Sequence, residues 1–474
     1  MRAWRETKAQ VVQDQTDFSF PPGPRRPPLV QTLEWVFRPV PFMEACRRRY
    51  GDCFTAALGP MRHVVFISEP EAVKQVLTGD PSIMHMGDIN GLFRPILGSS
   101  SLLLLDGEEH MRHRRLMLPP FHGRRMHGYG ELMSEIAENE LETWPVHQAF
   151  PLLPRMQTIT TEVILRAVFG VEEGSQLTDL RRLVVRLLDR CRSRSTMLPQ
   201  LRRELGGRSP WARLMRTVDD VDEVLLEEIR RRRSQPASEL GDDVLSLLVQ
   251  ARDDEGNPMS DRELRDELLT LLVAGHETTA TALAWTFERL VRHPSVLARL
   301  TDELATGDTS YLDAVIKETL RLRPVLPIVA RKLAAPYELN GYRFPKGTVL
   351  MPSIYLLHRH PSLYPNPDEF WPERFLDRHP DTYAWIPFGG GVRRCLGGPF
   401  AQFEMNVVLR TVLSRVTLEA AGEASETIAR RSFTFAPERG AMVVLKSRAG
   451  RSRRFRIRAG AREEATAPER VGAD

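Results

Sequence analysis

The longest regular pattern of apolar and polar positions begins at Ser260 and ends before His293, which Pro294 follows. Ser260 and Glu263 have the spacing of a capping box at a helix start, and a residue that precedes proline is a common helix end. The roughly thirty-three residues between would span about 50 Å at 1.5 Å per residue. The pattern therefore predicts one helix long enough to cross an entire domain.

Shorter patterns on both sides of this helix predict further helices and a few strands. Asp52–Leu58 and His63–Ser68 alternate like two strands joined by a Gly59-Pro60 turn, and Asn340-Gly341 predicts a tight hairpin. Helical spacing dominates 120–250, whereas 80–105 is irregular and 171–215 is arginine-rich and weakly patterned. Further predicted helices are Phe42–Tyr50, Glu69–Leu77, Gly107–Met117, Thr158–Val168, Ser295–Leu304 and Tyr311–Leu322. The expected fold class is mainly α with a smaller β region.

The two ends of the chain have a different composition from the middle. Residues 1–20 are polar and are expected to form a flexible arm, and the proline-rich Pro21–Pro28 predicts a stiff extended lead-in. Residues 448–474 are basic and predict a disordered tail, with binding to an acidic surface as an alternative. One catalytic domain is expected over 21–447.

Composition excludes several classes of protein. The 474 residues are 42% hydrophobic and 27% charged, as in globular proteins, and the formal net charge of +4 is too small to indicate nucleic-acid binding. The four cysteines show no paired spacing, which argues against zinc or a disulfide framework and favours a reducing compartment. Without a signal peptide or an apolar run of membrane-spanning length, a cytoplasmic protein with no integral membrane segment is expected.

The stretch 385–404, WIPFGGGVRRCLGGPFAQFE, combines the residue types that a haem–thiolate site needs. Cys395 directly precedes a predicted helix start, where backbone N–H groups and the helix dipole favour a thiolate. Arg393 can face a carboxylate such as a haem propionate. The alternative is a glycine-rich loop with an inert structural cysteine.

The order Phe388-x-x-Gly391-x-Arg393-x-Cys395-x-Gly397 resembles the haem-binding signature of the cytochromes P-450, the haem-thiolate monooxygenases. The resemblance implies haem b (iron protoporphyrin IX) as cofactor and the P-450 fold, with the haem between the long helix and the cysteine loop. It further implies that Cys395 binds the iron and that Phe388, Arg393 and Gly397 contact the cofactor.

Three more residues resemble family positions that hold the haem propionates. His110 and Arg114 lie four apart in a basic helix and share one face, and Arg331 resembles a further propionate contact. Many relatives have tryptophan in place of His110. The alternative for the helix pair is an ordinary solvated charged face.

The run 274–279, AGHETT, lies inside the long helix and resembles the family's oxygen-activation motif. The resemblance implies that Ala274 lies beside the haem, that Thr278 positions a water or donates a proton, and that Glu277 relays protons from solvent. Spacing places Leu271, Ala274, Thr278 and Ala282 on one mostly apolar face. Ordinary helix filling is the alternative.

Glu318 and Arg321 lie three apart on a predicted helix and can pair. Trp371–Phe375, WPERF, resembles a downstream family element whose Arg374 would join them in a buried structural network; exposed surface pairs are the alternative. The resemblance also assigns a set of residues to the substrate pocket: Phe93, Leu271, Val325, Ile328 and Phe433.

Together these motifs predict a monooxygenase that hydroxylates or epoxidises an apolar small molecule, such as a fatty acid, terpene or steroid-like compound. Dioxygen would be the co-substrate, and electrons ultimately from NAD(P)H would arrive through a separate ferredoxin and ferredoxin reductase, because the chain carries no flavin domain pattern. Arg112, Arg115 and Arg394 are candidate docking charges, and ordinary solvated surface charge is the alternative for them. A peroxide-driven peroxygenase and a non-catalytic haem-thiolate sensor are the alternatives.

Overall fold

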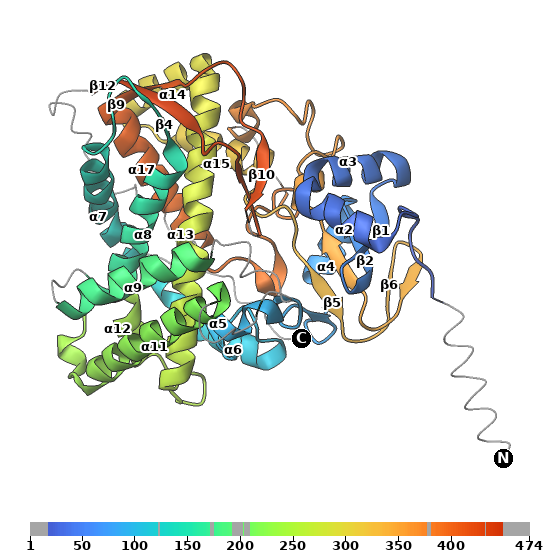
Figure 1. Cartoon of the computed structure of the whole chain (residues 1–474), viewed down its shortest axis with the longest axis horizontal. Coiled ribbons are helices and arrows are strands. Elements are labelled where there is room, and N and C mark those ends of the chain that lie inside the picture. Colours follow the sequence, from blue (N-terminus) through green and yellow to red (C-terminus); the bar gives the residue numbers. More distant parts are fainter. Residues whose placement is uncertain are drawn as a thin grey trace, which may run out of the picture.

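A computed structural model describes residues 18–121, 124–170, 175–191, 202, 209–376, 381–431 and 433–448. A large helical part surrounds α13 (Asp261–Arg292), and a smaller part contains the mixed sheet together with helices from the beginning of the chain (Figure 1). The predicted fold class, mainly α with a smaller β region, is confirmed.

The long helix α13 has the predicted ends. Ser260 caps it, and the side chains of Ser260 and Glu263 form both bonds of the capping box. The helix runs for 32 residues and ends at Arg292 before His293 and Pro294. Residues 280–290 are all buried, as expected for a helix that other elements cover on every side.

The other helices pack around α13 or cover the sheet. Two of them, α8 (Leu152–Phe169) and α17 (Gly398–Arg415), lie beside α13, and Gly275 of α13 leaves just enough room for Ile164 of α8. The remaining α-helices are α2 (Pro28–Phe37), α3 (Pro39–Tyr50), α4 (Pro70–Thr78), α5 (Arg94–Leu97), α6 (Gly107–Met117), α7 (Arg124–Leu141), α9 (Ser175–Cys191), α11 (Pro210–Ser234), α12 (Val244–Gln250), α14 (Pro294–Thr306), α15 (Ser310–Leu322) and α16 (Ile354–Leu357).

The largest sheet has the strand order β1-β2-β8-β5-β3, in which β2 and β8 are parallel and the other pairs antiparallel. Asn340 and Gly341 form the predicted hairpin turn with φ of 52° and 75°, which matches a type I′ turn. The strands of this part are β1 (Cys53–Leu58), β2 (Met61–Ile67), β3 (Met84–His85), β5 (Arg331–Leu333), β6 (Tyr337–Leu339), β7 (Tyr342–Phe344) and β8 (Val349–Pro352).

Two smaller sheets lie against the helical part. One has the order β4-β12-β9 and the other pairs β10 with β11, and both contact α13. Their strands are β4 (Ala149–Pro151), β9 (Val416–Ala420), β10 (Ile428–Arg431), β11 (Thr434–Pro437) and β12 (Met442–Arg448).

The structure differs from the predictions in three places near the chain ends. Residues 18–20 do not behave as part of a loose arm, because Ser19 bonds Arg343 and the ring of Phe20 stacks on His63 at 4.3 Å. The helix α2 follows the proline-rich lead-in and was not predicted. At the other end Arg448 belongs to β12 rather than to the tail; residues 1–17 and 449–474 lie outside the described residues.

Candidate functional site

The cysteine loop is closed by its own backbone and by α4. The amide of Cys395 donates to the carbonyl of Phe388 at 2.9 Å. Gly391 has φ of +63°, and a Cβ there would lie 1.9 Å from the carbonyl oxygen of Leu77. Glycine is therefore required at this position by the neighbouring chain as well as by the turn.

Cys395 lies just before α17, as predicted, and among the four cysteines it is the exposed one. The surrounding protein desolvates the thiol and raises its pKa, whereas the N–H of Gly397 and the charge of Arg114 act in the opposite direction. Helix-start N–H groups and a nearby guanidinium are the features that stabilise a thiolate.

Four basic side chains from distant parts of the chain lie beside this loop, close enough to shift one another's pKa values. Burial, together with the charges of Arg393, Arg114 and Arg331, lowers the pKa of His110 to about 3. Burial likewise lowers the pKa of Arg331 to about 10, helped by Arg393. Among the described residues, Asp106 is the carboxylate that offsets this charge, through an ion pair with Arg393.

The three arginines of this cluster donate hydrogen bonds to backbone carbonyls, which carry no net charge. Their positive charge is therefore little compensated by these contacts. Arg114 donates to the carbonyl of Arg394 at 2.8 Å, and the buried Arg331 donates to the carbonyl of Ala330 at 2.9 Å. Arg393 donates to the carbonyls of Leu102, at 3.2 Å, and Leu105. A desolvated cluster of this kind is stabilised by bound anions.

These observations fit the group that the sequence implies. Two propionates would supply the negative charge that the cluster of His110, Arg114, Arg331 and Arg393 lacks, and the sulfur of Cys395 would supply an iron ligand. A Cβ at Gly397 would meet no described atom within 4 Å, so packing against the described protein atoms does not explain why this residue is glycine. Within the described part of the chain, no group of three His, Cys, Asp or Glu side chains is arranged to hold a metal ion.

The predicted motif lies in the middle of α13, on a face of the helix that is partly exposed to solvent. Ala274 is exposed, and Leu271 and Thr278 are half-buried. The hydroxyl of Thr278 donates to the carbonyl of Ala274 at 2.8 Å. Ala282 was expected to continue this face, but it is 4% exposed and belongs to the main core, because α13 is buried continuously from Thr279 to Leu290.

Glu277, the acidic residue of the motif, is held by a side chain of the neighbouring helix α8. The amide of Gln157 donates to Glu277 at 2.8 Å, and the hydroxyl of Thr160 donates to the carbonyl of His276 at 2.9 Å. Gln157 and Thr160 were not predicted as site residues, since they lie about 120 positions away and carry no motif. Their spacing of three on one helix face was the available signal.

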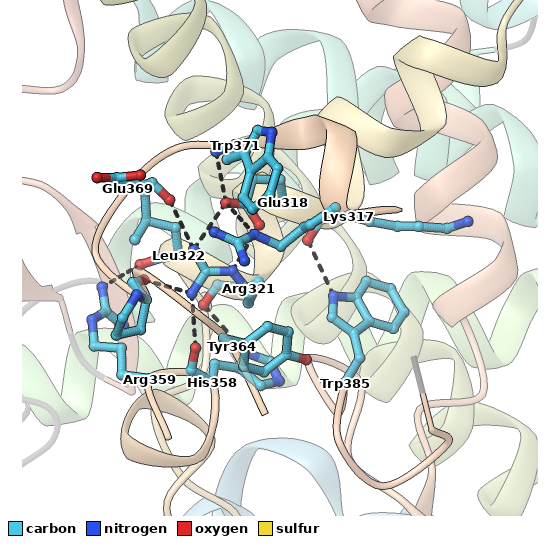
Figure 2. A network of polar contacts seen from close by, with 12 residues as sticks. Lys317, Glu318, Arg321, Leu322, His358, Arg359, Tyr364, Glu369, Trp371 and Trp385 are labelled. Carbon is cyan, nitrogen blue, oxygen red and sulfur yellow. Dashed lines mark hydrogen bonds and ion pairs between the residues drawn. The ribbon is translucent and has the colours of Figure 1, made fainter. Parts of the chain in front are cut away.

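Glu318, Arg321 and Arg374 meet in one buried network, of which Figure 2 shows Glu318 and Arg321. The guanidinium of Arg321 binds both carboxylate oxygens of Glu318, at 2.7 and 2.9 Å, and Arg374 reaches one of them at 3.2 Å. The amide of Trp371 also donates to Glu318 at 2.8 Å. Arg321 is 0% exposed, and its other donors bind the carbonyls of His358, Pro367 and Glu369.

This network is tied to the chain that leads into the cysteine loop (Figure 2). The ring of Tyr364 lies against Arg321, and its hydroxyl donates to the carbonyl of Ala384 at 2.9 Å. His358 accepts from the amide of Ile386 at 2.9 Å and lies 3.3 Å from the carbonyl of Arg321. Burial lowers the pKa of His358 to about 3, so the neutral ring can accept on one nitrogen and donate from the other.

The five predicted pocket residues are not all brought together. The rings of Phe93 and Phe433 meet edge to face, with centroids 5.9 Å apart. Leu271 packs at the edge of the main core, in which Val325 is buried. Ile328 packs against a different apolar cluster, the one that contains Trp35 and Phe66.

The three candidate docking charges differ in their surroundings. Arg112 is 27% exposed and is bound to Asp253 and Glu263, each at 2.7 Å, so much of its charge is already offset within the protein. Arg115 is 58% exposed and lies 3.4 Å from Asp254. Arg394 is exposed and lines a surface hollow together with the loop residues 387–391.

Comparison with known proteins identifies relatives over most of the chain. The family model described as "Cytochrome P450" matches residues 21–444. The "Putative cytochrome P450 135B1" of Mycobacterium tuberculosis is 42% identical over 438 residues, which cover 91% of this chain and 92% of the relative. "Putative cytochrome P450 138" of the same species is 42% identical and covers 90% and 96%.

Solved structures agree with this match. "Retinoic acid bound cyanobacterial CYP120A1" superposes with a TM-score of 0.80 at 27% identity, over 91% of this chain and all of that one. The "cytochrome P450DA heme domain" gives a TM-score of 0.79 at 25% identity, over 91% and 98%. In the described part of the structure, none of the helices combines the length and apolar character needed to cross a membrane.

Proposed function

This chain belongs to the cytochrome P450 family of haem-thiolate monooxygenases, and we propose that it hydroxylates or epoxidises a lipid-like apolar small molecule with electrons from a separate ferredoxin and its reductase. The observation that carries this proposal is that Cys395, an exposed residue beside a helix start, lies within the influence of a buried basic cluster in which Asp106 is the carboxylate among the described residues.

In the proposed site each residue has one task toward the cofactor. Cys395 binds the iron, His110, Arg114, Arg331 and Arg393 bind the propionates, and Phe388, Gly397 and Ala274 border the ring. When bound, the haem iron with its electron-rich thiolate ligand supplies the activation of dioxygen and favours cleavage of the O–O bond.

Thr278 and Glu277 are proposed to deliver the protons that this cleavage needs. The proton of the Thr278 hydroxyl is engaged by the carbonyl of Ala274, so its oxygen is left to accept a hydrogen bond and fix a water molecule. The contact with Gln157 holds the carboxylate of Glu277 one residue away. The geometry therefore favours Thr278 as the group that positions a water and Glu277 as the group that exchanges protons.

The substrate class rests on two observations. The proposed pocket residues Phe93 and Phe433, whose rings meet, and Leu271 and Val325 of the main core are apolar, and one similar structure is bound to retinoic acid. For the electron donor, the exposed Arg394 beside the loop hollow suits an acidic partner. A screen of lipids and terpenes for the ligand-induced spin-state shift of the haem would identify the substrate.

Replacing Thr278 by alanine should uncouple the enzyme while leaving it folded. Alanine is the better helix former, so folding and substrate binding should survive, but the water that Thr278 positions is lost. Proton delivery of this kind contributes about 10²–10⁴-fold in rate, and we expect the lower end because other waters can substitute. Product formed per electron donor consumed should fall and hydrogen peroxide release should rise.

Thr286→Ala is the matched control for this experiment. It removes the same kind of hydroxyl bond, from Thr286 to the carbonyl of Ala282 at 2.8 Å, in the buried half of α13. This control should keep wild-type coupling. If Thr278→Ala is equally well coupled, Thr278 does not control oxygen activation and the role assigned to this segment of α13 is wrong. The peroxygenase alternative would also show no change, because a peroxide-driven reaction does not need this pair.

A further inference from the structure

The helix α2 turns its apolar residues outward. Five of its ten residues are large, apolar and exposed, with Leu29 at 70% and Phe37 at 66%. Their positions, i, i+1, i+4, i+7 and i+8, form a single stripe about 120° wide at 100° per residue. The stripe consists of Leu29, Val30, Leu33, Val36 and Phe37.

The opposite side of α2 holds the helix in place with one polar and one aromatic residue. Gln31 donates to the carbonyls of Pro24, at 3.1 Å, and Arg26, at 2.7 Å, and it accepts from the amide of Ala57 at 3.0 Å. The ring of Trp35 lies 5.3 Å from that of Phe66. The stripe is therefore not needed to attach α2 to the protein, and its exposure is a surface feature of the folded chain.

Positive charge surrounds the stripe. Residues 25–49 contain six arginines and two glutamates, a net charge of +4, which equals the formal net charge of the whole chain. Arg25 precedes α2 and Arg38 follows it; both are exposed, and within the described residues neither forms an ion pair. Arg48 and Arg49 of the following helix α3 are exposed as well.

We infer that α2 is a docking surface for a lipid bilayer that carries anionic headgroups. An amphipathic helix with an apolar stripe and basic ends lies in the membrane interface with its apolar side chains among the acyl chains, and each arginine near an anionic surface adds to the attraction. A second copy of this chain fits less well, because a two-fold interface at α2 would bring Arg25 and Arg38 of both copies together. Figure 1 places α2 in the smaller part of the structure, away from α9.

Co-sedimentation of the haem-loaded protein with vesicles tests this inference without any use of catalysis. The wild type should bind phosphatidylcholine vesicles that contain phosphatidylglycerol, and should bind pure phosphatidylcholine vesicles at least roughly tenfold more weakly. Leu33→Gln combined with Phe37→Gln should weaken binding roughly tenfold or more, since two apolar side chains leave the acyl region. Each of Arg25→Gln and Arg38→Gln should weaken it about fivefold, and raised salt should do the same.

Val185→Gln is the matched control, because Val185 is an exposed valine, 41% accessible, on α9. It should bind vesicles like the wild type, and all variants should keep the wild-type melting temperature and carbon-monoxide spectrum. The inference is overturned if the wild type stays in solution with anionic vesicles, if the Leu33 and Phe37 variant binds equally well, or if binding ignores headgroup charge. It is also overturned if the lipid-free wild type is a dimer that the Leu33 and Phe37 variant dissociates, since another copy would then cover the stripe.

Discussion

Replacing Glu318 by alanine should leave almost no folded, haem-loaded protein. Its carboxylate is the partner of two guanidiniums, those of Arg321 and Arg374, and it also accepts from the amide of Trp371. Glu318 and Arg321 are both 0% exposed, so water cannot replace the lost charge. Stranding a buried charge costs about 3–5 kcal/mol, which is a large part of the roughly 5–15 kcal/mol that stabilises a typical protein.

Glu318→Ala should lower haem binding as well as stability. The reason is that His358, Tyr364 and Trp385 connect the network to the start of the cysteine loop. The measurements are haem bound per protein and the thermal unfolding midpoint. Glu303→Ala is the control: Glu303 pairs with Arg299 on the surface of α14, and an exposed pair contributes about 0–1 kcal/mol. Normal haem content and normal melting of Glu318→Ala would show that the network does not support the loop.

Replacing Cys395 by histidine should abolish the red-shifted carbon-monoxide band of the reduced haem and all monooxygenase activity. The band is the signature of a thiolate-ligated haem iron, and imidazole is neither anionic nor as electron-rich. We expect haem to remain bound in part, because the basic cluster and the ring contacts are unchanged.

Cys191→Ala is the control for this variant, since Cys191 is a half-buried cysteine at the end of α9. Burial raises the pKa of its thiol to about 12, so it is not a thiolate, and its variant should keep the band. An unchanged band in Cys395→His would remove Cys395 as the iron ligand and with it the central assignment of the site.

Local signals made much of the fold predictable. The capping box at Ser260 and the proline after His293 determine the ends of α13 within the chain itself, and Gly107–Met117 was predicted with its observed ends. Asn340-Gly341 specified its hairpin because both residues tolerate positive φ. In each case the residues that decide the structure are neighbours in sequence.

What the sequence could not reveal depends on contacts between distant residues. The helix α2 was missed because it begins at Pro28, within the proline-rich stretch that predicted an extended lead-in, and the outward direction of its apolar stripe is set by the fold. Gln157, which holds Glu277, and His358, which joins Arg321 to Ile386, belong to no local motif. Ala282 has the spacing of the open face, but packing buries it.

Labelled dioxygen tests the central claim most directly. The wild type would be given an apolar compound that shifts the spin state of its haem, together with ferredoxin, ferredoxin reductase and NAD(P)H, under isotopically labelled dioxygen in ordinary water. The account predicts one labelled oxygen atom in each product molecule, with product and donor consumed in nearly equal amounts. Unlabelled product, product that appears only when peroxide is added, or a haem-loaded protein that forms no product with any bound compound would contradict it.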